Sequence, residues 1–221
     1  MKELVSSFRN SLFNSELSDI RIDIAEYGID SLFENDIVLA IPIVKSVAAI
    51  GSFVFDLRAK NALRQTLQFI KTFNSQAISD KKYQEYKTKI NNDSKFAEKE
   101  LGRVLILLDR NIDIEKSALL ACIYKAYVNG EINWERYQEL SEVNSRLILS
   151  DVKLLFDIEA GVVNKSDQCE SYQIDRLLSL GLVSSSPLKI YPGAIPRLSE
   201  VKVSTIGFLY CKHTKAIIEK Q

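Results

Sequence analysis

Apolar residues recur at helical spacing along most of the chain. The clearest example is the series Ala97, Leu101, Val104, Leu105 and Leu108, which follows the i, i+4, i+7, i+8, i+11 pattern of one helix face. Similar patterns predict helices over residues 3–14, 80–108, 114–128, 133–145 and 146–160, and the helix over 80–108 is interrupted near residues 91–93. In residues 16–33, Ile20, Ile22 and Ile24 alternate with polar residues as in a strand, but a helical stripe explains more positions, so we predict a helix there. The short connections between these stretches are typical of an antiparallel helix bundle.

The longest apolar stretch lies between Asp36 and Asp56, where Lys45 is the one charged residue. It predicts a helix that starts near Pro42, kinks near Gly51 and continues to residue 73. Two hypotheses compete for it: a central helix buried on all sides, or a helix that enters a bilayer, which needs about 20 apolar residues. The mid-stretch lysine favours the buried helix. The residues that mark this core or membrane axis are Pro42, Lys45, Val47, Ile50 and Phe53.

The pattern changes after residue 160. A loop over 161–170 precedes a helix over 172–180, an extended segment, an excursion rich in proline and glycine, the strand-like Val201–Val203, and a capped helix over 206–218. This order resembles the end of a winged helix-turn-helix module. The predicted fold is therefore mainly α: a helical bundle around a central apolar helix over 1–160, then a small α+β winged-helix-like module over 161–221.

The winged-helix resemblance implies candidates for nucleic-acid contact on the recognition helix and in the wing. They are Gln173, Arg176, Lys189, Arg197 and Lys202. Cations suit phosphate contacts, and polar side chains suit base reading. Winged helices also serve as protein-binding modules, so both functions stay open for this module.

The composition limits which partners and which catalytic chemistry we expect for this protein. Lysine plus arginine balance aspartate plus glutamate at 29 each, so no global field favours nucleic acid or an anionic surface. Three cysteines without a close pair, and no secretory apolar segment after Met1, predict a cytoplasmic protein with free thiols. A single histidine, His213, and the absence of a glycine-rich phosphate loop predict a protein that is not an enzyme and uses no metal or cofactor.

A family resemblance rests on two blocks. The first is IPIVKSVAAIGSFVFDLRAKNALRQTLQFIKTF (residues 41–73), and the second is LLDRNIDIEKSALLACIYKAYVNGEINWERYQELSEV. Together they resemble uncharacterised bacterial and phage-associated helical proteins, including the abortive-infection alpha group. The resemblance implies a context of phage defence or mobile elements, and no catalytic motif comes with it.

These observations predict a non-enzymatic interaction or regulatory protein whose foremost partner is another protein. Two alternatives stay open: a membrane-active effector that uses residues 37–55, and a DNA-binding regulator that uses the C-terminal module. Homo-oligomers are also among the expected assemblies. Membrane association is the alternative to a purely cytoplasmic location.

Overall fold

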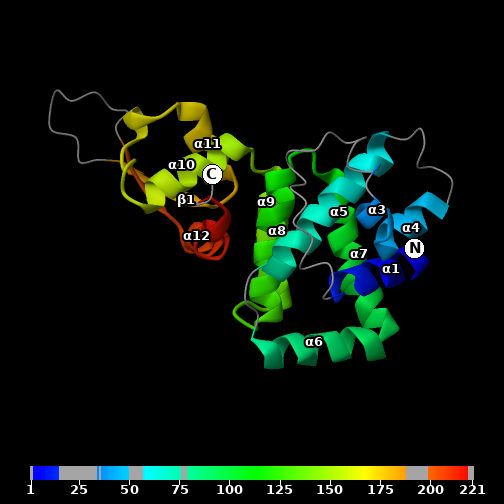
Figure 1. The fold of residues 1–221 in the computed structure, drawn as a ribbon. Coiled ribbons are helices and arrows are strands. Elements are labelled where there is room, and N and C mark those ends of the chain that lie inside the picture. Colours follow the sequence, from blue (N-terminus) through cyan, green and yellow to red (C-terminus); the bar gives the residue numbers. More distant parts are fainter. Residues whose placement is uncertain are drawn as a thin grey trace, which may run out of the picture. The chain divides into compact units, whose positions relative to one another are not determined.

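The computed structural model of the chain describes residues 2–14, 34, 36–49, 57–75, 79–187 and 199–218. The protein is mainly helical, with a small two-stranded antiparallel sheet near its C-terminus (Figure 1), so the predicted fold class is confirmed. Contacts within the chain define two compact units, Met1–Tyr137 and Gln138–Gln221. This division falls inside a helix and precedes the boundary expected after residue 160.

The N-terminal unit is built from helices. In chain order they are α1 (Lys2–Leu12), α3 (Asp36–Leu39), α4 (Pro42–Ala49), α5 (Leu57–Ser75), α6 (Asp80–Asn92), α7 (Ser94–Arg110), α8 (Ile114–Val128) and the start of α9 (Trp134–Arg146). The predicted interruption between α6 and α7 falls at Asp93, whose carboxylate accepts a hydrogen bond from the Phe96 N–H at 2.9 Å. Asp93 therefore caps α7, as aspartate commonly does at this position.

The centre of this unit is α8 rather than the stretch expected to be buried. Every side chain from Ser117 to Ala126 is buried, and α8 packs mainly against α5. Helix α4 packs against α1 through a narrow face that includes Ile43 and Val44, while Lys45 is exposed. The prediction of a helix buried on all sides is therefore wrong for α4, because Lys45, Ala48 and Ala49 are exposed and only Ile43 and Val44 are buried within it. Pro42 does occupy the first helical position, as predicted; Ile50, Phe53 and the expected kink lie outside the described residues.

A cluster of tyrosines surrounds one buried carboxylate where α6, α7 and α8 meet. Glu100 accepts hydrogen bonds from the Tyr86 hydroxyl at 2.8 Å and the Tyr127 hydroxyl at 2.5 Å, and Tyr86 also pairs with the Tyr124 hydroxyl. Burial raises the pKa of Glu100, although both hydrogen bonds act in the opposite direction. Burial also raises the pKa of each of the three tyrosines, so their hydroxyls stay protonated and act as donors.

Loop residues end α8 and start α9. Gly130 adopts a φ of 73° just after α8, a conformation that side chains rarely allow. The Asn133 side chain then accepts a hydrogen bond from the Arg136 N–H at 2.8 Å and caps α9. These two residues set the short connection between α8 and α9.

The C-terminal unit combines helices with the sheet. After the second part of α9 its elements are α10 (Leu149–Glu159), the 3₁₀ turn η2 (Ser166–Gln168), α11 (Ser171–Ser179), β1 (Val183–Pro187), β2 (Ser199–Val203) and α12 (Thr205–Ile218). Strand β2 pairs with β1, with Val203 opposite Val183, and Glu200 forms an isolated antiparallel bridge with Lys165. Helix α10 packs against α11, α12 and β2, which explains why it belongs to this unit.

Helix α12 approaches the start of β1 closely at Gly207. A Cβ atom added to Gly207 would lie 2.0 Å from the Leu182 carbonyl oxygen and 2.8 Å from a Val203 methyl group. The same carbonyl accepts a hydrogen bond from the Ser204 N–H at 2.9 Å, and the Ser204 hydroxyl accepts one from the Gly207 N–H at 3.1 Å. Ser204 therefore caps α12, and a side chain at position 207 would collide with the Leu182 carbonyl oxygen.

Candidate functional site

The most distinctive surface feature of the N-terminal unit is an apolar groove between α1, α4, α5 and α7. The groove has a volume of about 530 Å³, within the range typical of ligand-binding pockets. We define the groove by its described lining residues, which are Leu4, Ile43, Val47, Arg58, Ala59, Ala62, Leu63, Thr66, Gly102, Leu105, Ile106, Asp109 and Arg110. Most of these side chains are apolar, and the charged ones come from the start of α5 and the end of α7.

The groove contains several small residues. Ala59, Ala62 and Thr66 recur at i, i+3 and i+7 on α5, so they share one face of that helix. On α7, Gly102 lies one turn before Leu105 and Ile106, and a Cβ atom at Gly102 would meet no atom within 4 Å. The Thr66 hydroxyl donates to the Ala62 carbonyl oxygen at 2.7 Å, so its proton is already used. Open space above Gly102 therefore adjoins a mainly apolar surface.

The groove contains one large apolar side chain that is exposed. Ile106, in the groove, is 50% exposed. An exposed apolar side chain on a concave, mainly apolar surface is characteristic of interaction sites.

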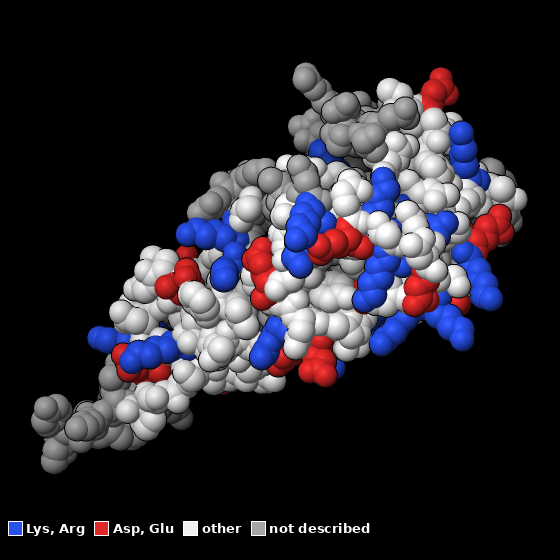
Figure 2. All heavy atoms as spheres, turned by 90° about the horizontal axis from the view of Figure 1, so that it is seen from below, with Lys and Arg blue, Asp and Glu red and all other residues white. Residues whose placement is uncertain are grey.

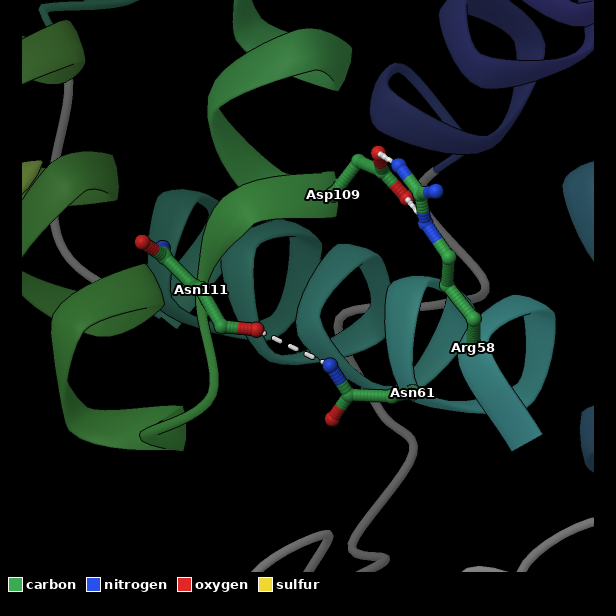
Figure 3. Close-up of polar contacts among 4 residues, drawn as sticks. All are labelled: Arg58, Asn61, Asp109 and Asn111. Carbon is green, nitrogen blue, oxygen red and sulfur yellow. Dashed lines mark hydrogen bonds and ion pairs between the residues drawn. The ribbon is translucent and has the colours of Figure 1, made fainter.

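An ion pair lies at one end of the groove. The Arg58 guanidinium donates to the Asp109 carboxylate from Nε at 3.3 Å and from Nη2 at 2.5 Å (Figure 3). The two side chains are 76% and 37% exposed, so water screens the attraction between them. Arg110 also lines the groove and is exposed, which leaves the described lining with one more cation than anions.

A buried polar network holds α5 against the turn between α7 and α8. The Asn61 amide donates to the Asn111 carbonyl oxygen at 2.9 Å, as Figure 3 shows, and the Gln65 amide donates to the Ile112 carbonyl oxygen at 2.8 Å. The Ser117 hydroxyl donates to Gln65 Oε1 at 2.7 Å and accepts from the Asn111 amide at 2.9 Å. Because these bonds fix the spacing of α5 and α7, the groove is formed before anything binds to it.

Of the residues predicted for a core or membrane axis, Val47 lines the groove and Lys45 is exposed. No helix within the described parts of the chain is both long enough and apolar enough to cross a membrane.

The sequence pattern did not indicate that Gly102, Ala59 or Ala62 would line a groove. The available signal was the run of apolar residues 104–108, which is wider than one buried helix face and therefore leaves Ile106 outside the core.

The predicted nucleic-acid residues are not brought together as free donors. Arg176 donates to the Asp151 carboxylate from Nε at 2.8 Å and from Nη2 at 2.6 Å, and its guanidinium lies 4.9 Å from the Tyr172 ring centre. Lys202 is exposed and forms an ion pair with Glu200 at 2.9 Å. Gln173 lines a polar cavity between α10 and α11, and Lys189 and Arg197 lie outside the described residues.

Charges on the surface do not form one continuous basic patch in the view of Figure 2, where acidic side chains lie among the basic ones. Two of the thiols are not activated either: burial raises the pKa of Cys211 to about 12 and also raises the pKa of Cys169. Within the described residues, no group of three or more histidine, cysteine, aspartate or glutamate side chains could hold a metal ion.

Comparisons of the chain with models of protein families, with curated proteins and with solved structures find no match. The resemblance to the abortive-infection alpha group therefore stays a prediction.

Proposed function

We propose that this protein is a non-enzymatic interaction protein that binds a helix of a protein partner in the groove. The observation that carries the proposal is the groove itself: a preformed apolar surface with open space at Gly102 and an exposed Ile106. Amphipathic helices commonly bind to proteins by laying their apolar face in such a groove.

The choice of a helix over an extended peptide follows from the lining. The groove is formed by helices, whose backbone N–H and C=O groups bond to one another within each helix. An extended segment would find no free sheet edge to pair with, whereas a helical segment satisfies its own backbone groups. From Arg58 to Thr66 the α5 side of the groove spans about 12 Å, which is about two helical turns.

The small residues of the groove would allow a partner helix to lie close to α5 and α7. At Gly102, Ala59 and Ala62 the groove presents little side-chain bulk, so a partner helix could insert a large apolar side chain there. Buried apolar anchors of this kind supply most of the binding energy in protein interfaces.

A cytoplasmic regulatory role in phage defence or mobile-element biology is the context we propose, supported by the family resemblance alone.

A groove-filling variant tests this function. We expect a fluorescent amphipathic peptide of about 15 residues, with leucines at i, i+3, i+4 and i+7, to bind the wild type. Gly102→Trp should weaken binding at least about tenfold, equivalent to about 1.4 kcal/mol, because the indole fills the open space. Gly102→Ala, the matched control, should bind nearly as the wild type does. Equal binding by all three proteins, or equal binding of a peptide with scrambled leucines, would contradict the proposal.

DNA binding by residues 138–221 is the second candidate function. It is supported by the order in which Lys165, β2 and β1 lie side by side, followed by α12, which is the order expected of a winged-helix sheet. The test is a mobility shift with duplex DNA. We expect binding to fall steeply with salt and to weaken in Lys202→Ala, and absence of a salt-dependent shift would exclude this function. A membrane role for residues 37–55 stays a prediction.

A further inference from the structure

The charged end of the groove restricts which helix can bind. Arg58, Asp109 and Arg110 are the charged residues in its described lining. Asp109 is already compensated, because Arg58 donates two hydrogen bonds to its carboxylate (Figure 3). Among the described lining residues, the charge without a counter-ion at this end is therefore the cation of Arg110, which is exposed at the last position of α7.

The opposite part of the groove is different. Around Gly102, Thr66 and Leu63 the described lining carries no charged side chain. A helix lying along α5 and α7 thus meets an apolar surface over most of its length and a guanidinium at one end only. Charge complementarity of this kind fixes the direction in which a partner lies more than it adds to affinity.

We infer that the occupant of the groove is an amphipathic helix of a protein partner that carries carboxylates at the end lying on Arg58 and Arg110. This inference rests on the proposed function, since it specifies the partner of the same groove. A carboxylate at this end can accept hydrogen bonds from the Arg110 guanidinium, a pairing that matches in geometry as well as charge. A lysine at the same end would meet a like charge instead.

The experiment compares three peptides that share one leucine stripe and differ at one end, which carries glutamates, glutamines or lysines. On the wild type we expect the glutamate peptide to bind about 3- to 10-fold tighter than the lysine peptide, with the glutamine peptide between them and the difference shrinking at high salt. Arg110→Glu should reverse the order of the glutamate and lysine peptides. Lys95→Glu, the same charge change at the other end of α7, should leave the order unchanged.

A second variant tests the role of Asp109. Asp109→Asn removes the competing carboxylate while keeping the size of the side chain, so the glutamate peptide should bind still tighter. If all three peptides bind the wild type equally, or if Arg110→Glu leaves their order unchanged, the inferred charge preference is overturned while the groove's function stands. If none of the peptides binds, the proposed function itself fails.

Discussion

The Arg58 guanidinium donates two hydrogen bonds to the Asp109 carboxylate and thereby joins the first turn of α5 to the last turn of α7. Arg58 is largely in water and Asp109 is partly exposed, so the pair should add little to stability. We predict that Arg58→Ala changes the free energy of unfolding by no more than about 1 kcal/mol, measured by urea denaturation. A loss several times larger would show that the pair holds the bundle together instead of shaping the end of the groove.

Two glycine-to-alanine changes should have opposite effects. Gly102→Ala places a methyl group in open space inside a helix, and should stabilise the protein by about 0.5–1 kcal/mol. Gly207→Ala drives a methyl group into the Leu182 carbonyl oxygen, and should destabilise the C-terminal unit by about 1–3 kcal/mol or more. Thermal unfolding of the two variants beside the wild type checks both signs, and a stabilising Gly207→Ala would contradict the described packing of α12.

The buried Glu100 should make stability depend on pH. Its pKa in the folded protein is raised above the ordinary value of 4.5, so the folded state favours the protonated carboxyl. The stability that this group contributes is fully present below pH 4.5 and is lost as pH rises through the folded pKa. Glu100→Gln keeps the shape and cannot ionise, and the Tyr86 and Tyr127 hydroxyls can still bond to its amide.

We therefore predict that the wild type loses stability relative to Glu100→Gln as pH rises above 4.5, measured by urea denaturation across pH. Glu135→Gln, which removes an exposed negative charge on α9, is the matched control and should not reproduce this trend. A difference between wild type and Glu100→Gln that stays constant with pH would mean that burial does not disfavour the Glu100 carboxylate.

The ion pair of the C-terminal unit should matter more than the pair at the groove. Asp151 is 1% exposed, and Arg176 supplies both of its side-chain hydrogen bonds described above. Arg176→Ala leaves the buried Asp151 carboxylate without these two hydrogen bonds, so it should lower the free energy of unfolding, measured by urea denaturation, more than Arg58→Ala does. The double variant Arg176→Ala/Asp151→Ala should recover part of the loss, and a purely additive effect would show that the two residues do not interact.

The sequence predicted the elements well where local chemistry decides them. Gly130, Asn133 and Ser204 stop or cap helices through backbone and side-chain bonds to near neighbours, so their roles are readable from a few residues. The sequence pattern did not show which helix lies at the centre of the N-terminal unit. Burial depends on neighbours from distant parts of the chain, and α8 is surrounded whereas the more apolar α4 lies at the edge.

The groove could not be predicted from the sequence pattern either, because residues from distant parts of the chain form it. Gly102 looks like an unremarkable helical glycine until Ala59 and Ala62, some forty residues earlier, are brought beside it by the pairing of α5 and α7. The same holds for Arg176, which the pattern favoured as a phosphate contact. Its engagement with Asp151 depends on the packing of α11 against α10.

The most direct test of the central claim is to map where a helix binds. A glutamate-ended amphipathic peptide that carries a photoreactive group among its leucines is cross-linked to the wild type, and the attached residues are identified by mass spectrometry. We predict attachment to the groove faces of α5 and α7, around Ala62, Leu105 and Ile106, with loss of attachment in Gly102→Trp and retention in Gly102→Ala. Attachment spread over residues 138–221, or unchanged by Gly102→Trp, would contradict the account.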